Sequence, residues 1–462
     1  MKFVVLNGSP RETNSFTYQY LRYIETNFPM HDFIVHHIGR KIKKIENDQE
    51  YFDSILKIIK GADGVIWLYP VYIQLIPSQL KRFIELVFER KKQSSFKGKN
   101  ATSISTSGKF YDHLAHYYIQ AISEDFGMNY SRGYSAEMME LMKKDERIRL
   151  RKFFMQFVNN CENKTETAKY YSPFVFDYPI YKPTKINDNP KTKNYKVTIL
   201  TDTTETDVSL NNMINTFVKL MPCEVTVVNI NEADIKGGCL GCLKCAPENI
   251  CFYPDGYMEI FKQQVIAANA LVYAFKTQDR YFSSQMKIHF DRAFFNGHRP
   301  VFTGQQQAYF VSGPLRQMPI LREAIEGMSE VGRANLVGIV TDEYADSKII
   351  TNLIQNIIDG MLWGIEHDKY AGPKTFLGVG GHKVFRDLIH TYQIVFPQDY
   401  SYYKKEKLFD WPKIFFGQFS FILKPLMRFS SFRKRFFAMS GKYQTRLFDK
   451  VIKKEVSNLQ DQ

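Results

Sequence analysis

The chain repeats one order of strands and helices, and this repeat limits the folds that it can adopt. Residues 2–7 (KFVVLN) form an apolar run that ends in a polar loop, and residues 196–201 (KVTILT) restart the same pattern. The strongest internal match follows the third expected strand of each copy, where PSQLKRFIE (Pro77–Glu85) corresponds to SSQMKIHFD (Ser283–Asp291). Several matches in one order predict a tandem duplication.

Each copy alternates short apolar runs with helical segments. In the first copy we expect strands at residues 2–7, 31–38, 64–70, 100–106 and about 128–134, and helices that include 77–90 and 114–126. In the second copy the corresponding strands are 196–201, 223–230, 270–275, 307–313 and 335–340. Strands that alternate with helices on short connections predict an α/β fold with a doubly wound parallel sheet in each copy.

Composition divides the chain into four parts. We expect a first domain at residues 1–158 and a second at 195–400. Residues 159–194 between them are rich in Lys, Thr, Asn and Pro without a helical period, which is typical of a linker. Residues 401–462 form a basic, Phe-rich C-terminal extension, which we expect to be helical.

Most of the net charge of +14 lies in this extension, where 14 Lys and Arg stand against 4 Asp and Glu between Lys404 and Glu455. The segment Lys413–Phe437 interleaves phenylalanines with basic residues. Such a segment can pack on the protein's own body or make peripheral contact with an anionic membrane. Nucleic-acid binding is disfavoured because no recognition motif accompanies the charge.

Other features of the chain favour a cytoplasmic location. The first residues, MKFVVLNGSP, lack the long apolar region of a signal peptide, and no apolar run reaches the roughly 18 residues of a membrane span. Four of the six cysteines lie within residues 239–251, while Cys161 and Cys223 are isolated. This spacing is more typical of a metal site than of a secreted disulfide framework.

The loops that follow the strands of the first copy predict a flavin site, because ligands of doubly wound sheets bind beyond the carboxyl ends of the strands. In GSPRETNSF, the groups suited to a phosphate at a helix N-terminus are Ser9, Arg11, Asn14 and Ser15. Pro70, Val71 and Tyr72 could frame a flat ring, and Thr106, Ser107 and Gly108 could bond its polar edge. A monophosphate with a planar ring is FMN, and the absence of Walker and G-x-G-x-x-G motifs disfavours triphosphates and dinucleotides.

These stretches resemble the NAD(P)H-dependent FMN reductases of flavodoxin-like fold. The signatures of that family are a GSPR-x-x-x-(N/S) phosphate loop and a P-V-Y…P-x-x-L-K-x-F-I-(D/E) segment, and this chain has GSPRETNS and PVYIQLIPSQLKRFIE in the same order. The resemblance implies two flavodoxin-like domains, FMN as cofactor and NAD(P)H as electron donor.

The second copy carries a cysteine-rich loop between its second strand and the next helix. Cys239, Cys242, Cys245 and Cys251 have the spacing C-x2-C-x2-C-x5-C, and neighbouring glycines permit a tight backbone. Two successive x2 gaps are typical of cubane clusters, so a [4Fe–4S] cluster is favoured, with zinc or metal-free thiols as alternatives. The loop is similar to that of the iron–sulfur flavoprotein branch of the same family.

The first loop of the second copy, TDTTETDVSLNN, places Asp202, Glu205 and Asp207 where a phosphate would bind, which disfavours flavin there. Iron–sulfur flavoproteins pair as dimers with cluster and flavin close across subunits. The resemblance therefore implies a fused pair in which one FMN and one cluster face each other across the domain interface.

Together these features predict an oxidoreductase that passes electrons between NAD(P)H or a reduced ferredoxin and a small-molecule or protein acceptor. Two alternatives stay open, namely an NAD(P)H:quinone or FMN reductase with structural zinc, and a non-enzymatic redox-sensing protein. No residue is assigned a catalytic role, and assembly into a homo-oligomer also stays open.

Overall fold

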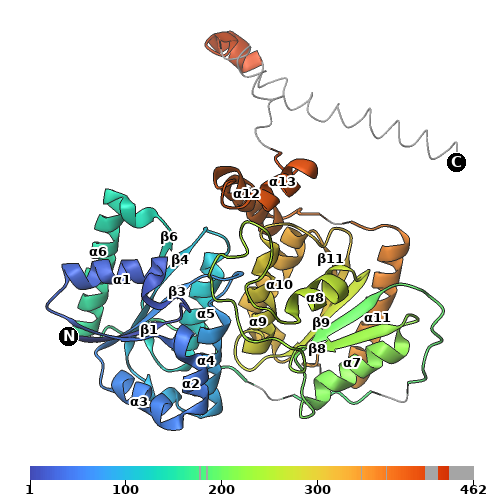
Figure 1. The fold of residues 1–462 in the computed structure, drawn as a ribbon, viewed down its shortest axis with the longest axis horizontal. Helices are drawn as coiled ribbons and strands as arrows, with labels where there is room; N and C mark the ends of the chain where they lie inside the picture. Colours follow the sequence, from blue (N-terminus) through green and yellow to red (C-terminus); the bar gives the residue numbers. More distant parts are fainter. Residues whose placement is uncertain (176–177, 184–185, 345, 371, 411–424, 436–462) are drawn as a thin grey trace. The chain divides into compact units, whose positions relative to one another are not determined.

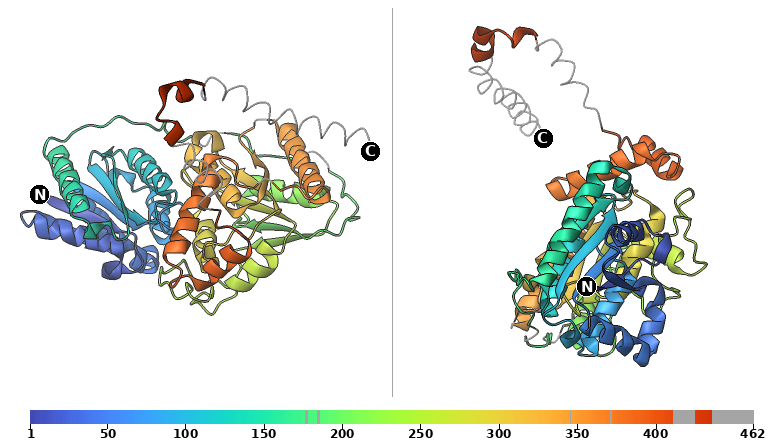
Figure 2. Two further views of the ribbon diagram at one scale, coloured as in Figure 1. Left: turned by 90° about the horizontal axis from the view of Figure 1, so that it is seen from above. Right: turned by 90° about the vertical axis from the view of Figure 1, so that its left-hand side faces the viewer.

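The computed structural model describes residues 1–462 except 176–177, 184–185, 345, 371, 411–424 and 436–462. The chain divides into two compact units, Met1–Tyr402 and Tyr403–Gln462. The first unit contains two parallel sheets with helices on both faces (Figure 1), and Figure 2 shows the same elements from two further sides. The predicted α/β fold with two doubly wound parallel sheets is thus confirmed.

The first sheet is built from the first copy of the repeat. Its strands are β1 (Lys2–Asn7), β2 (Asp32–His36), β3 (Gly64–Pro70), β4 (Asn100–Ser107), β5 (Asn129–Tyr130) and β6 (Tyr134–Glu137). They lie in the order β2-β1-β3-β4-β5, and β6 also pairs with β4. All pairings are parallel, so the carboxyl ends of β1, β3 and β4 lie at one edge of the sheet.

The second sheet repeats this order. Its strands are β7 (Val197–Thr201), β8 (Val225–Asn229), β9 (Ala270–Lys276), β10 (Gln306–Ser312) and β11 (Asn335–Thr341). They pair in parallel in the order β8-β7-β9-β10-β11, which corresponds strand by strand to the first sheet. This is the strand order of flavodoxin-like folds. It is also what a tandem duplication requires, although the duplication itself stays a prediction.

Helices cover both faces of each sheet. In the first copy they are α1 (Phe16–Asn27), α2 (Ile38–Asn47), α3 (Gln49–Lys60), α4 (Ser78–Glu89), α5 (Asp112–Asp125) and α6 (Lys144–Glu162). In the second they are α7 (Val208–Leu220), α8 (Tyr257–Ile260), α9 (Ser284–Arg292), α10 (Pro319–Gly332), α11 (Ser347–Glu366), α12 (Phe376–Thr391) and α13 (Pro397–Lys405). Short polar side chains begin several of them; Asp48, for example, accepts from the Tyr51 backbone N–H at 2.9 Å at the start of α3.

The apolar core continues from one copy to the other. Along β3, Val65, Trp67 and Tyr69 face one cluster while Ile66 and Leu68 face another, because side chains alternate across a strand. The first of these clusters also contains residues of the second copy. The inner faces of the two domains therefore share one hydrophobic core, and each domain also has an outer core of its own.

The structure differs from the predicted elements in three places. Most of the stretch GRKIKKIEND (residues 39–48), where the sequence analysis names no element, forms α2. The fifth strand is split into β5 and β6. The helix α6 runs to Glu162 and so enters the predicted linker at 159–194. The linker is also tied to the domains, because Asn100 donates to the Thr165 carbonyl at 2.8 Å and Tyr181 is buried.

Little of the predicted C-terminal extension can be compared with the structure. Most of Lys413–Phe437 lies outside the described residues, so its docking or membrane contact stays a prediction. Within the described part of the chain, no helix is long and apolar enough to cross a membrane.

Candidate functional site

The first loop (Gly8–Ser15) folds tightly against the start of α1. Ser9 is fully buried, and its backbone N–H donates to the Asn7 side chain at 3.0 Å. Arg11 donates its backbone N–H to the Ser9 hydroxyl at 3.3 Å, and Ser15 caps α1 by accepting from the Tyr18 N–H at 3.1 Å. Asn14 is exposed in a single helical turn. Three of the four residues predicted to bind a phosphate, Arg11, Asn14 and Ser15, thus lie just before the N-terminus of α1. The fourth, Ser9, is buried in the protein.

The second loop (Pro70–Leu75) follows β3 and contains two residues in a strained backbone conformation. Tyr72 and Leu75 exchange backbone hydrogen bonds of 2.8 and 3.2 Å, which closes a tight turn. The turn forces positive φ angles on Ile73 (38°) and Gln74 (67°). Side-chain-bearing residues adopt such angles at a cost, and this kind of strain is concentrated at functional sites.

Gln74 is fully buried, yet neither its amide oxygen nor its amide nitrogen has a hydrogen-bond partner. A buried amide without partners costs about 1–3 kcal/mol. An unpaired amide in a candidate ligand-binding loop is expected where a bound ligand supplies the missing hydrogen bonds.

The third loop (Ser107–Tyr111) follows β4 and joins the other two. The Val71 N–H donates to the Thr106 carbonyl at 2.9 Å, which ties the second loop to the end of β4. The hydroxyls of Thr106 and Thr17 lie 2.6 Å apart and tie β4 to α1. The Ser107 hydroxyl accepts from the Lys109 N–H at 2.9 Å. The structure therefore brings the three predicted flavin loops together at one edge of the first sheet.

The corresponding edge of the second sheet is occupied by carboxylates. Asp202 stands where the first copy has Gly8, bonded to the Ser283 hydroxyl, and burial raises its pKa to about 7. Asp342 accepts from the Ser312 hydroxyl at 2.6 Å and the Gly313 N–H at 2.9 Å. Two buried carboxyl groups thus lie at this edge, and Asp202 is one of the three acidic residues named from the sequence; the expected lack of flavin there stays a prediction.

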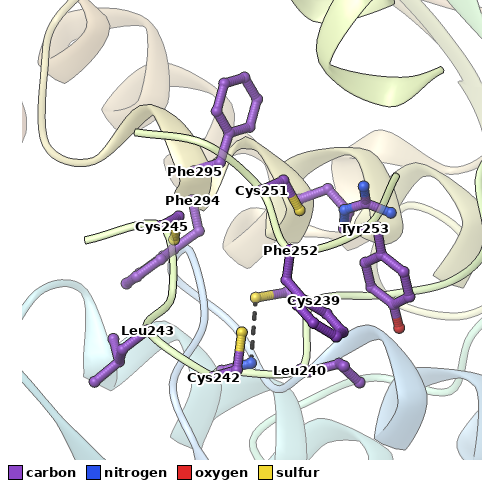
Figure 3. A pocket seen from close by; sticks show the side chains of 12 residues that line it. Cys239, Leu240, Cys242, Leu243, Cys245, Cys251, Phe252, Tyr253, Phe294 and Phe295 are labelled. Carbon is purple, nitrogen blue, oxygen red and sulfur yellow. Dashed lines mark hydrogen bonds between the residues drawn. The ribbon is translucent and has the colours of Figure 1, made fainter. Parts of the chain in front are cut away.

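The four cysteines of the cysteine loop (residues 237–251) line one small cavity of about 30 Å³, together with Arg292 and aromatic side chains (Figure 3). Burial raises the pKa of Cys239 to about 12 and that of Cys245 to about 11. The Gly241 N–H donates to the Cys239 sulfur at 3.4 Å. In this arrangement the thiols of Cys239 and Cys245 are protonated at neutral pH.

The four thiols line the same cavity, but their arrangement does not form a coordination shell for a metal ion. Among the residues that the structure describes, no three His, Cys, Asp or Glu side chains are arranged to hold a metal ion. The donor chemistry fits a thiolate-bound metal, and closure around one requires the side chains to turn and lose their protons.

Arg292 is a charged group at this cavity that the sequence reasoning missed. It is buried, it pairs with Asp255 at 2.7 Å, and it donates to the Gly237 carbonyl at 3.1 Å. It therefore holds one end of the cysteine loop and places a positive charge beside the thiols.

The cysteine loop also contacts the first copy, at the start of α4 and at Tyr72 of the second loop. Gln79 donates to the Cys239 carbonyl at 3.1 Å. A Cβ on Gly238 would lie 2.2 Å from the Ser78 hydroxyl oxygen, and one on Gly241 would lie 1.8 Å from that of Tyr72. Glycine is therefore required at both positions for the loops to approach. The structure thus places the cysteine loop against the second loop, and the fused pair of one FMN and one cluster stays a prediction.

The helices α4 and α9 join the two copies by a reciprocal contact. The Ser78 N–H at the start of α4 donates to Asp291 of α9 at 2.8 Å, and the Ser284 N–H at the start of α9 donates to Glu85 of α4 at 2.6 Å. Lys81 forms buried ion pairs with Glu85 at 2.9 Å and with Asp279 at 2.8 Å. The same side of each helix thus binds the other, as in an isologous dimer interface.

This interface is built from the segments that gave the strongest internal match, Pro77–Glu85 and Ser283–Asp291. The match was a signal that could have revealed it, because carboxylates recur at the same position of both copies. Neither Gln74 nor Asp202 stands out in the sequence as a buried group.

Comparison with known proteins gives a partial match. Residues 1–137 match the model of the family described as NADPH-dependent FMN reductase. No curated protein matches the chain.

Several solved structures are similar to about a third of the chain. The NADH:FMN oxidoreductase EMOB in its apo form has 18% identity and a TM-score of 0.30, covering 34% of this chain and 87% of its own. The NAD(P)H:(acceptor) oxidoreductase FerB from Paracoccus denitrificans has 20% identity and a TM-score of 0.31, covering 35% and 98%. An FMN-dependent NADH-azoreductase from Bacillus anthracis str. Ames Ancestor, in complex with FMN, has 14% identity and a TM-score of 0.28, covering 35% and 99%.

The loop sequences and the strand order of the first domain thus agree with the match of residues 1–137 to the model of the NADPH-dependent FMN reductase family.

Proposed function

We propose that the chain is an FMN-dependent oxidoreductase that takes electrons from NAD(P)H at its first domain. The observation that carries this proposal is the meeting of the three loops at the carboxyl edge of the first sheet, with the unpartnered amide of Gln74 in the second loop. The match of residues 1–137 to the FMN reductase model supports it.

The residues present fit FMN. The start of α1 and the positive charge of Arg11 favour the phosphate. Tyr72, Thr106 and Ser107 offer a ring and hydroxyls near the second loop, and the Gln74 amide can both donate to and accept from the polar edge of a flavin. Bound FMN would supply hydride chemistry, since a flavin accepts two electrons from a nicotinamide.

We further propose that Cys239, Cys242, Cys245 and Cys251 hold an iron–sulfur cluster. Their shared cavity, the soft sulfur donors and the cation of Arg292 support this assignment. A cluster would pass single electrons, so the chain would connect two-electron and one-electron partners, with ferredoxin as an alternative donor. If the same thiols held a zinc ion instead, the chain would be a quinone or FMN reductase with a structural metal. If the protein bound no flavin, a non-enzymatic redox sensor would be favoured.

The first experiment is the absorption spectrum of the anaerobically purified full-length protein, with iron and zinc measured on the same sample. We expect flavin bands over a broad cluster absorption, with iron present. Cys242→Ser should lose the iron and keep the flavin, whereas Cys161→Ser, which alters a cysteine outside the cavity, should keep both. Zinc without iron contradicts the cluster, and the lack of flavin bands after FMN addition contradicts the flavoenzyme.

The role of Gln74 is tested by Gln74→Leu. Loss of one hydrogen-bonded amide should weaken FMN binding about tenfold, or about 1.4 kcal/mol, in a fluorescence titration. The flavin-free variant should be at least as stable as the parent in urea, because an unpaired buried amide has been removed. Unchanged FMN affinity would show that the amide has no role in the flavin site.

A further inference from the structure

Helix α12 lies on the third loop of the first copy, although it follows the second copy in the chain. The Tyr111 hydroxyl donates to the Leu377 carbonyl at 2.6 Å. Phe385 stacks on Phe110 with ring centroids 4.1 Å apart, and a Cβ on Gly108 would lie 3.1 Å from the Leu388 side chain. Leu377, Phe385 and Leu388 recur near helical spacing, so one face of α12 covers residues 108–111.

The approach of the helix to this loop is close. A Cβ on Gly381 would lie 3.0 Å from the Phe110 ring and 2.5 Å from Val331 of α10. A larger residue at Gly381 would therefore push α12 away from the third loop.

Two carboxylates hold this segment in place. Glu330 of α10 accepts from the backbone N–H groups of Thr375 at 3.0 Å and Gly378 at 3.2 Å, which fixes the first turn of α12. Asp399 of α13, the next helix in the chain, is fully buried and accepts from Asn249 of the cysteine loop at 3.2 Å. The helix that follows α12 is thus anchored to the cysteine loop.

We propose that α12 is a specificity-determining cover of the flavin site. It closes the side of the site formed by residues 108–111 and restricts the access of freely diffusing small molecules to the flavin. This inference rests on the proposed function and deepens it, because it concerns which molecules can reach the cofactor. The apolar contacts of Phe385 and Leu388 are the parts of α12 that make this cover.

The test compares Phe385→Ala/Leu388→Ala with Phe376→Ala in the full-length protein loaded with FMN. Phe376 lies on the same helix but is 86% exposed, so its loss leaves the cover in place. Quenching of flavin fluorescence by iodide measures access to the ring. We expect the quenching constant to rise severalfold in the double variant and to match the parent in Phe376→Ala. Equal quenching in all three proteins would overturn the proposal.

A second measurement needs no flavin and separates this inference from the proposed function. Hydrogen exchange of the segment 108–114 in the flavin-free protein should be faster in Phe385→Ala/Leu388→Ala than in the parent or in Phe376→Ala. Unchanged exchange would show that α12 does not protect the loop, whatever the cofactor content. Failure of the parent to bind FMN, with faster exchange in the double variant, would reject the flavoenzyme and retain the cover over the loop.

Discussion

Asp202 marks a difference between the two copies at the end of the first strand of each sheet. The first copy has Gly8 at this position, where its backbone N–H donates to Leu68 of β3 at 2.7 Å. The second copy has a carboxyl that bonds to Ser283, and its other oxygen has no partner. The same strand end therefore carries a backbone hydrogen bond in the first copy and a buried carboxyl group in the second.

The raised pKa of Asp202 predicts a pH-dependent stability. Its value is about 7 in the folded protein against 3.8 as the ordinary value, so between these values the folded state holds a proton that the unfolded state has lost. Stability from this group is complete below about pH 4 and is lost as the pH rises through 7, by up to about 4 kcal/mol.

Asp202→Asn should remove the pH-dependent loss of stability. The free energy of unfolding of the variant, measured in urea, should therefore rise relative to that of the parent between pH 4 and pH 8. The control is Asp207→Asn. Burial opposes ionisation of Asp207, but hydrogen bonds from Lys276 and Thr204 outweigh it and lower its pKa. Its effect should be constant above pH 5. A parallel pH dependence of Asp202→Asn and the parent would contradict the prediction.

At the scale of elements, α4 and α9 depend on each other for their N-terminal turns. Each helix receives a carboxylate from the other at its first residue, where free backbone N–H groups and the helix dipole favour negative charge. Burial alone would raise the pKa of Glu85, but Lys81 and the hydrogen bonds from Ser284 outweigh it and lower the value. The ion pair of Lys81 with Glu85 is therefore charged as well as buried.

Glu85→Gln should destabilise the protein by about 3 kcal/mol, because it removes one ion-pair partner of Lys81 while leaving that cation buried. Glu89→Gln, on the same helix in a partly exposed pair with Arg82 at 2.6 Å, should cost no more than about 1 kcal/mol. Urea unfolding of both variants measures the two losses in free energy of unfolding. Equal losses would show that the buried ion pairs of Lys81 contribute no more to stability than the partly exposed pair of Arg82.

At the scale of the molecule, the two copies form one body in the first unit. Their inner faces share a core, and Arg280 of the second copy pairs with Asp125 of the first at 2.6 Å. Separation of the two copies would expose this shared core to water, together with the charged side chains of Lys81, Glu85 and Asp291, which are all fully buried. We therefore expect the two copies to stay together even when the linker is cut.

A protease site inserted after the exposed Asn187 tests this point. The cut chain should elute as one particle of the intact size in native gel filtration and separate into two fragments in urea. Two particles under native conditions would show that the interface is weak without the covalent connection.

The sequence by itself determined the local structure and the kind of chemistry. Apolar runs such as residues 2–7 become buried strands because both faces of a parallel sheet are covered, and the order of these runs gave the doubly wound sheets. Three flavin loops and four cysteines could be named because their residue types and spacing have few other uses. The stretch that forms α2 was missed because its many lysines obscure the apolar positions that pack on α4.

Only the tertiary structure decided which of these parts meet. Three contacts join residues more than a hundred positions apart. They are the contact of Gly241 with Tyr72, the hydrogen bonds between carboxylates and helix N-termini of α4 and α9, and the packing of α12 on Gly108. The burial of Gln74 and Asp202, and hence the unpaired amide and the raised pKa, follows from the same packing. Such contacts depend on how whole faces fit together, and local spacing in a single sequence carries no record of that fit.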